Sequence, residues 1–138
     1  TLPTAEGATK VTLERFDPVV HVPLMREWCA ARGTPLPWDA VDFYPRVGFV
    51  ADGCAASFLY QTDSKVGLID GTVADPRVDS EVRSRALDAV LQAVVREAEA
   101  LGLKALLTYT TAPTLLAKVP NLGGRVQGDG YAYIAWRF

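Results

Sequence analysis

The stretch VADPRVDSEVRSRALDAV, residues 73–90, runs from a strand-like apolar segment through a charged, polar hinge into a helix, and it contains no glycine. A helix N-terminus presents unpaired backbone N–H groups and a partial positive charge, so it can hold an anion whatever side chains surround it. Two interpretations follow. The helix start is either a seat for an anionic ligand, or an ordinary start that Asp79 or Ser80 caps while the arginines face solvent.

The helix that begins in this stretch has the clearest periodicity in the sequence. Its apolar residues fall on one stripe and its charged and polar residues on the opposite side, which is the pattern of an amphipathic helix. We expect it to end at Leu101 and Gly102, because glycine is common just after a helix. The stripe consists of Val82, Ala86, Leu87, Val90, Leu91, Val94, Val95, Ala98 and Leu101.

Strand-like runs precede this helix. Residues 46–52, 54–62 and 66–74 are rich in apolar and β-branched side chains. Asp52-Gly53 is a strong hairpin signal between the first two runs, and DSKVG, residues 63–67, is a weaker one between the next two. Together they predict a three-stranded antiparallel meander.

The remaining elements flank the meander and the long helix. Residues 104–111 predict a buried strand, and Pro120 with the glycines after it ends a short helix within residues 112–124. The others, in chain order, are a loose terminus at 1–9, a strand at 10–16, a helix at 19–32 that Gly33 stops, an irregular loop at 34–47 with a helical turn at 38–43, and a final strand at 131–138.

This order of elements predicts a single mixed α+β domain over residues 1–138. The antiparallel meander would pass through the long helix into a parallel strand. No internal repeat or low-complexity segment interrupts the order, so we expect neither a linker nor a second domain.

Composition argues against several classes of protein. Apolar residues make up 49% and charged residues 22% of the chain, which is typical of a globular domain rather than a disordered or fibrous one. The formal net charge of −2 gives no overall basic field for nucleic acid, so only a local basic patch would attract it. No apolar run approaches the roughly 20 residues of a membrane span. No basic-then-apolar leader precedes the first strand, so we expect a cytoplasmic protein without a membrane partner.

The cysteines and the single histidine do not suggest a reactive or metal-binding cluster. Cys29 and Cys54 lack CxxC spacing and a second Cys/His cluster, which argues against a zinc site and a disulfide framework. We expect both to be buried apolar residues and the protein to bind no metal. His21 lies in the first helix, where a triad with Cys29 would lack a third partner, so we expect a surface or core histidine.

From about residue 47 to 124 the sequence and its element order resemble the GCN5-related N-acetyltransferase (GNAT) superfamily. The best local pieces are RVGFVADGCAASFLYQTDSKVGLIDGTVADP, the long helix and LGLKALLTYTTAPTLLAKVPNLGGRV. The DSK turn and the glycine-poor loop look similar to those of short GNAT-like proteins encoded by some bacteriophages. The resemblance implies a mixed, mostly antiparallel sheet whose fourth strand splays from the fifth. The gap would take the pantetheine arm of acetyl-CoA, and the pyrophosphate would rest on the following helix.

The family signature at that helix is Q/R-x-x-G-x-G/A, which the resemblance places on Asp79, Val82 and Ser84. Two positions depart from it, because Asp79 is acidic and Val82 is bulky, whereas Ser84 is small. Charge-assisted bonds from arginines could compensate, since guanidinium groups bind phosphate well. The residues expected to hold the cosubstrate are therefore the backbone of Thr72, Val73 and Ala74, the helix start with Val82 and Ser84, and the side chains of Arg77, Arg83 and Arg85.

Acyl transfer to an amine needs a base for the ammonium proton and often an acid for the leaving thiolate. The resemblance implies a carboxylate base on the fourth strand, where Asp70 stands. The alternative is a solvent-facing Asp70 beside a bulge that Gly71 produces. The family's usual acid is a Tyr four residues before Gly123, but that position is Val119. Tyr109, or else Tyr131 or Tyr133, could substitute, or each could be a core or rim aromatic.

The loop before the meander would line the acceptor site, as the resemblance implies. Its acidic and aromatic side chains would suit a cationic amine, and the alternative is simple loop packing. These residues are Trp38, Asp39, Asp42 and Tyr44.

The main functional hypothesis is a small N-acetyltransferase that moves an acetyl group from acetyl-CoA to an amine by direct attack. One alternative is a GNAT-fold interaction module that binds CoA weakly or not at all. Another is acyl transfer to a nucleic-acid base amine in phage DNA modification, because a flipped base needs only a pocket. The sequence leaves open the acceptor and the choice between a monomer and a homodimer.

Overall fold

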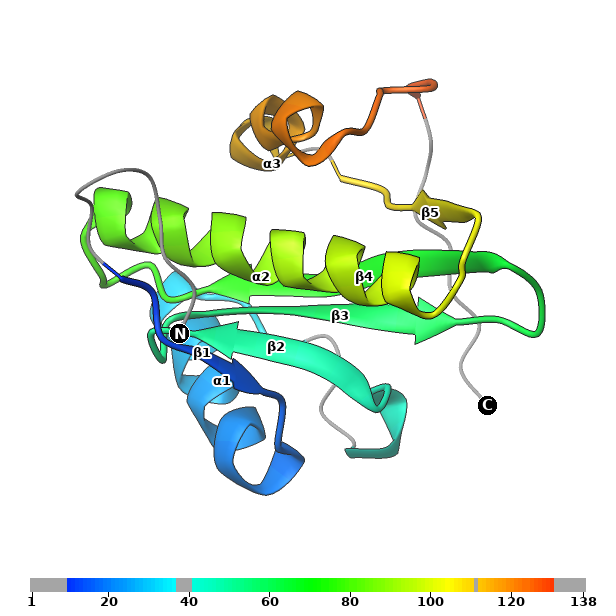
Figure 1. Cartoon of the computed structure of the whole chain (residues 1–138). Coiled ribbons are helices and arrows are strands. Elements are labelled where there is room, and N and C mark those ends of the chain that lie inside the picture. The colour runs from blue at the N-terminus through cyan, green and yellow to red at the C-terminus, as the bar shows by residue number, and fades with distance from the viewer. Residues whose placement is uncertain (1–9, 37–40, 111, 131–138) are drawn as a thin grey trace.

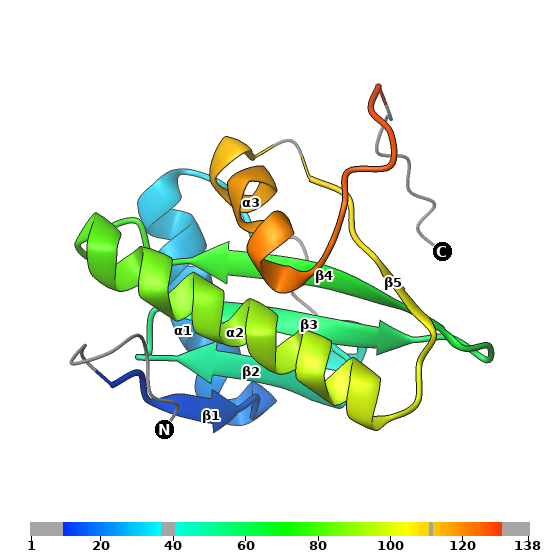
Figure 2. The ribbon, with the colours of Figure 1, turned by 45° about the horizontal axis from the view of Figure 1, so that its top comes forward.

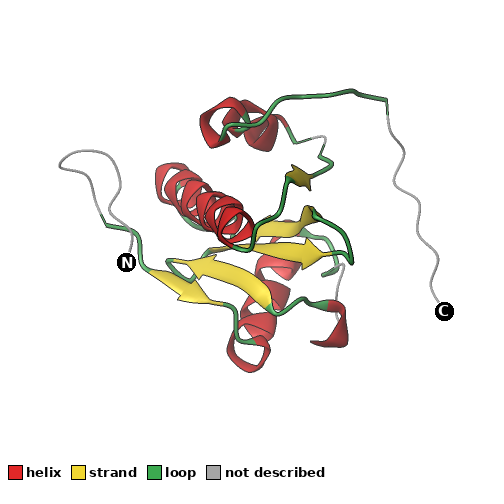
Figure 3. Cartoon of the chain, turned by 45° about the vertical axis from the view of Figure 1, so that its right-hand side comes forward, coloured by secondary structure: helices red, strands yellow, loops and turns green. Residues whose placement is uncertain are grey.

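The computed structural model describes residues 10–36, 41–110 and 112–130. A five-stranded sheet lies between two helices, with α1 on one face and α2 on the other (Figures 1 and 3). The strands follow chain order across the sheet, and only the last pair, β4 and β5, is parallel. The expected mixed α+β fold is confirmed. The strands are β1 (Leu13–Arg15), β2 (Val47–Ala51), β3 (Ala55–Gln61), β4 (Val66–Ala74) and β5 (Ala105–Leu107), and the helices are α1 (Pro18–Arg32), η1 (Val41–Phe43), α2 (Ser80–Ala100), α3 (Pro113–Lys118) and η2 (Pro120–Leu122).

Helix α2 packs its apolar stripe on the sheet as its periodicity predicts. Val90 and Val94 are fully buried within the main core cluster, between the helix and the inner faces of β2 and β3. The Asp79 carboxylate accepts a hydrogen bond from the Glu81 N–H at 3.1 Å, which caps the helix start. The helix ends before Gly102, whose φ of 79° lies in the left-handed region that glycine favours.

Helix α1 covers the opposite face through a second, smaller core. Met25 and Trp28 pack there against Phe58 of β3. Asp17 caps the helix by accepting a hydrogen bond from the Val19 N–H, and Gly33 ends it with a φ of 83°. This end is the one that the sequence predicts.

Two strand predictions have different outcomes. The meander is confirmed. Ala51 pairs with Ala55 across its first turn, the Cys54 N–H donates to the Ala51 carbonyl at 3.0 Å, and Asp52 and Gly53 between them both take positive φ values. A strand parallel to β4 does form within the predicted range 104–111, but the expectation that it is buried is wrong. Strand β5 has three residues and is exposed or half-buried, with Leu107 43% exposed. The physical reason is that β5 pairs with β4 alone within the described part of the chain. The final strand expected at 131–138 lies outside the described residues.

Candidate functional site

Strands β4 and β5 separate partway along their length. They pair from Val66–Ala105 to Leu68–Leu107, and the Thr108 hydroxyl then donates to the Ile69 carbonyl at 2.9 Å. Past that bond, residues 70–74 have no strand partner on this side within the described chain (Figure 2). The backbone of β4 is therefore available there to a ligand entering between the strands, since an unpaired strand edge offers N–H and C=O groups.

A bulge turns β4 at the point of separation. The register with β3 shifts between Ala56 and Phe58, and Gly71 has a φ of 69°. A Cβ at Gly71 would stand 2.9 Å from the ring of Phe58, so both the backbone conformation and the space require glycine. The hydroxyls of Ser57 and Thr72 hydrogen-bond across the bulge at 2.9 Å.

Asp70 lies directly before this bulge. Its side chain is exposed, and its carboxylate accepts a hydrogen bond from the Gly71 N–H at 2.7 Å. The structure thus has the solvent-facing Asp70 beside a Gly71 bulge, which is one of the two arrangements expected from the sequence. An exposed carboxylate at the opening between β4 and β5 can accept a proton from a group held there.

Asp75 anchors the loop that connects β4 to α2. It is 7% exposed, its N–H donates to the Cys54 carbonyl at 2.7 Å, and its two carboxylate oxygens bind Arg77 in a bidentate pair at 2.9 and 3.0 Å. The hydrogen bonds from Arg77 hold the pKa of the Asp75 carboxyl below its usual range, against the opposing effect of burial. The guanidinium of Arg77, expected to bind phosphate, is therefore already engaged by a carboxylate.

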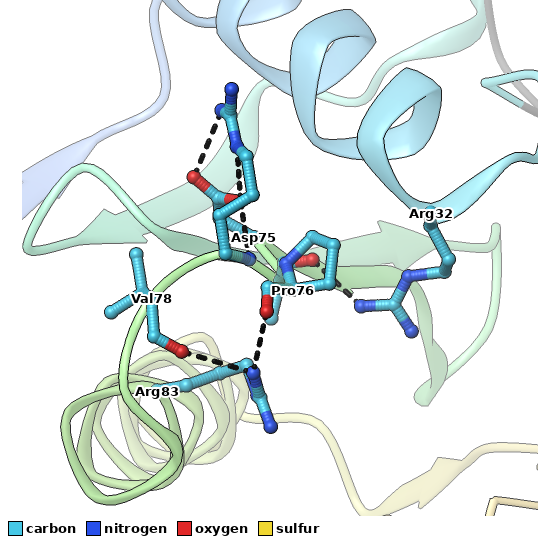
Figure 4. A network of polar contacts seen from close by, with 7 residues as sticks. Arg32, Asp75, Pro76, Val78 and Arg83 are labelled. Carbon is cyan, nitrogen blue, oxygen red and sulfur yellow. Dashed lines mark hydrogen bonds and ion pairs between the residues drawn. The ribbon is translucent and has the colours of Figure 1, made fainter.

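Further arginines brace the same loop, as Figure 4 shows. Arg83 donates from one nitrogen to the carbonyls of Pro76 at 3.2 Å and Val78 at 3.1 Å. Arg32, from the end of α1, donates to the carbonyl of Ala74 at 2.8 Å. The Ala74 carbonyl, expected to face the pantetheine arm, thus has a partner within the protein.

The start of α2 is less obstructed than its sequence suggests. Val82 is half-buried and packs against the main core cluster, so the core takes up part of its bulk. Arg85 is the arginine of the predicted set that has no hydrogen bond or ion pair to another described residue, which leaves its guanidinium for a ligand.

Lys118 of α3 is a residue that the sequence analysis missed. Its ammonium group bonds to the Ser84 hydroxyl and to the Asp88 carboxylate, both at 2.8 Å. Its side chain is 13% exposed. No local signal marks it, because its partners lie 30 and 34 residues away in the sequence.

The two described residues of the predicted acceptor loop, Asp42 and Tyr44, differ in burial. Tyr44 is half-buried, and its ring lies 5.1 Å from both Phe16 and Phe58, so it is part of an aromatic cluster over α1's face of the sheet. Asp42 of η1 is exposed. Trp38 and Asp39 lie outside the described residues, as do Tyr131 and Tyr133. Tyr109 is 68% exposed just beyond β5.

The cysteines and the histidine are core residues. Burial, helped by Asp52 and Asp75, raises the pKa of Cys54 to about 11, so its thiol stays protonated at neutral pH. His21 is 3% exposed, and its Nδ1 accepts a hydrogen bond from the Asp17 N–H at 2.8 Å. Within the described ranges, no three His, Cys, Asp or Glu side chains are grouped to hold a metal ion. The described helices also include none long and apolar enough to cross a membrane.

Lowering the pH should remove the contribution of the Asp75–Arg77 pair to the free energy of unfolding. Because the folded-state pKa of Asp75 is depressed, the pair stabilises the fold above the unfolded-state value of about 3.9. That stability is lost as the pH falls through the lower folded-state pKa. Denaturant unfolding at a series of pH values should show wild type and Asp75→Asn converging in acid. If the difference in unfolding free energy between wild type and Asp75→Asn stays constant with pH, this prediction is wrong. Asp63→Asn, which removes a carboxylate from an exposed turn, is the control.

Known structures resemble this chain, although the sequence matches no protein-family model and no curated protein. An acetyltransferase from Trypanosoma brucei superposes with a TM-score of 0.67 at 14% identity, covering 91% of this chain and 100% of that one. A GNAT-family acetyltransferase from Streptococcus pneumoniae gives 0.58 at 12% identity, covering 93% and 100%. An aminoglycoside N-acetyltransferase in complex with CoA gives 0.56 at 13% identity, covering 96% and 99%. The chain therefore has the fold of the GCN5-related N-acetyltransferases.

Proposed function

We propose that this protein is an N-acetyltransferase that uses acetyl-CoA and an amine acceptor. The observation that carries the proposal is the separation of β4 from β5 beside the Gly71 bulge, which frees a stretch of backbone on a strand that is inside the sheet over the rest of its length. An extended amide-bearing chain is the ligand that such a strand edge binds, through main-chain hydrogen bonds. The pantetheine arm of CoA is a chain of this kind. One structural relative of the same fold was solved in complex with CoA, which supports the choice.

The residues at the opening fit this chemistry. The N–H and C=O groups of Thr72 and Val73 would pair with the amides of the arm, and a backbone N–H would polarise the acetyl carbonyl by donating a hydrogen bond to it. Any residue type supplies these backbone groups. Asp70 would take the proton from the attacking ammonium, directly or through water. Acetyl-CoA supplies the activated acyl group as a thioester. Tyr109 stands beyond the end of β5 as the candidate acid for the leaving thiolate, in place of the missing Tyr at Val119.

A second candidate is a GNAT-fold module that binds a partner without turnover. It is favoured by Val119, which has no hydroxyl, and by Arg77 and Arg83, whose guanidinium groups already bind the loop. The phage DNA-base acyltransferase has less support, since no observation in the described chain points to a nucleic acid.

Titration with acetyl-CoA separates the first two candidates. Ligand at about 100 times its Kd should raise the free energy of unfolding by roughly 2.7 kcal/mol. Thermal unfolding with and without acetyl-CoA measures the shift, and calorimetry gives the Kd. Free adenosine at the same concentration is the control for nonspecific stabilisation. No shift at millimolar acetyl-CoA would exclude the acetyltransferase and leave the interaction module.

A further inference from the structure

The two strands that separate at the candidate site each lead into a helix. Strand β4 leads into the start of α2, and the chain after β5 leads into α3. Figure 2 shows α3 beside the N-terminal half of α2 and on the same side of the sheet. Lys118 joins them, because its ammonium group from α3 reaches Ser84 and Asp88 of α2.

The charges around this junction are unequal. Asp79 at the N-cap and Glu81 in the first turn place two carboxylates at the start of α2, where they would repel an anion. Asp75 neutralises the guanidinium of Arg77, and Arg83 donates to backbone carbonyls of the loop. The ammonium group of Lys118 forms its ion pair with the carboxylate of Asp88, whose side chain is 50% exposed. Water reaches the Asp88 end of this ion pair and weakens the attraction there, so an entering anion can compete for the lysine.

We infer that Lys118 recognises the diphosphate of the cosubstrate by exchanging Asp88 for phosphate oxygens. The inference rests on the proposed function. A chain that lies between β4 and β5 and runs on along the start of α2 would come close to the Ser84–Lys118 junction. A lysine ammonium suits this position, because it is a flexible point charge that can keep its bond to the Ser84 hydroxyl while it turns toward phosphate. Lys118 thus adds a second positive charge to that of Arg85 beside the acidic helix start.

Variants of Lys118 and cosubstrates of graded length test the inference. Lys118→Met should weaken acetyl-CoA binding about tenfold, as expected for the loss of one charge-assisted hydrogen bond. It should leave the binding of S-acetylpantetheine unchanged, because that thioester has the arm without phosphate. Lys118→Arg keeps the cation and should retain most of the affinity for acetyl-CoA. Lys65→Met, which removes the same charge from the exposed turn between β3 and β4, is the control.

Two further experiments test whether Lys118 binds the diphosphate or only holds α3 against α2. Asp88→Asn frees the lysine, so acetyl-CoA should bind as tightly as to wild type or tighter. If Asp88→Asn weakens binding as much as Lys118→Met, the bridge is a structural brace and the inference is wrong. With acetyl-dephospho-CoA, which keeps the diphosphate, the tenfold loss in Lys118→Met should persist. Its disappearance would assign the lysine to the 3′-phosphate instead and overturn the diphosphate assignment.

The outcomes also separate this inference from the proposed function. If wild type binds neither acetyl-CoA nor S-acetylpantetheine, the acetyltransferase proposal fails and the role of Lys118 fails with it. If wild type binds acetyl-CoA and Lys118→Met binds it equally well, only the role of Lys118 is lost. Thermal unfolding of each variant without ligand establishes that the compared proteins are folded.

Discussion

Replacing Asp70 by asparagine should slow acetyl transfer by about 10²–10⁴-fold near neutral pH while the affinity for acetyl-CoA stays the same. An ammonium acceptor must lose a proton before it attacks, and the asparagine amide cannot take that proton. The amide oxygen can still accept the hydrogen bond that the Gly71 N–H now gives to Asp70, so the bulge is preserved. Release of the CoA thiol with a panel of primary amines measures the rate, and calorimetry measures the Kd.

The pH dependence of the rate shows whether Asp70→Asn is slow because it lacks a base. As the pH rises toward the amine's own pKa, near about 10 for an alkylamine, more acceptor is already deprotonated and the base matters less. The rate of Asp70→Asn should therefore approach that of wild type in alkali. Asp63→Asn, at the other end of the same hairpin, removes the same charge and should leave the rate unchanged. Equal rates for Asp70→Asn and wild type at neutral pH would remove Asp70 as the base.

The parts of the fold that the sequence predicts well are those decided by neighbouring residues. The Asp52-Gly53 turn, the end of α1 at Gly33 and the cap at Asp79 each depend on a few adjacent residues, whose backbone preferences are strong. The stripe of α2 is also a local pattern. These features fix the order of the elements, from which the mixed sheet follows.

The parts that the sequence did not reveal depend on contacts between distant segments. Lys118 meets Asp88 across 30 residues, and Arg32 meets the Ala74 carbonyl across 42. The residues next to a lysine or arginine in the sequence do not reveal a distant partner, since both residue types are common on solvated helix faces. The shortness of β5 has the same origin, because Thr108 replaces a strand pairing with a side-chain bond to Ile69.

Replacing Gly71 by alanine should lower the free energy of unfolding by about 2–4 kcal/mol, the sum of two costs. A left-handed backbone costs a non-glycine residue about 1–2 kcal/mol, and φ at Gly71 is 69°. The added Cβ would also stand 2.9 Å from a ring carbon of Phe58, whose side chain is fully buried, so relieving the contact would disturb the core around the ring. Denaturant unfolding measures the change. Where the variant is still folded, acetyl-CoA should bind less tightly, because the bulge directs the free backbone of β4.

Gly53 separates the two costs. Its φ of 61° is close to that of Gly71, but nothing lies within 4 Å of a Cβ built there. Gly53→Ala should therefore show the backbone cost alone, and the excess in Gly71→Ala is the collision with Phe58. Combining Gly71→Ala with Phe58→Leu should recover at least about 1 kcal/mol relative to the sum of the single changes, as coupled neighbours do. Equal losses at Gly53 and Gly71 with no coupling to Phe58 would mean that the ring does not hold the bulge, and that the backbone of β4 is shaped by the Ser57–Thr72 bond instead.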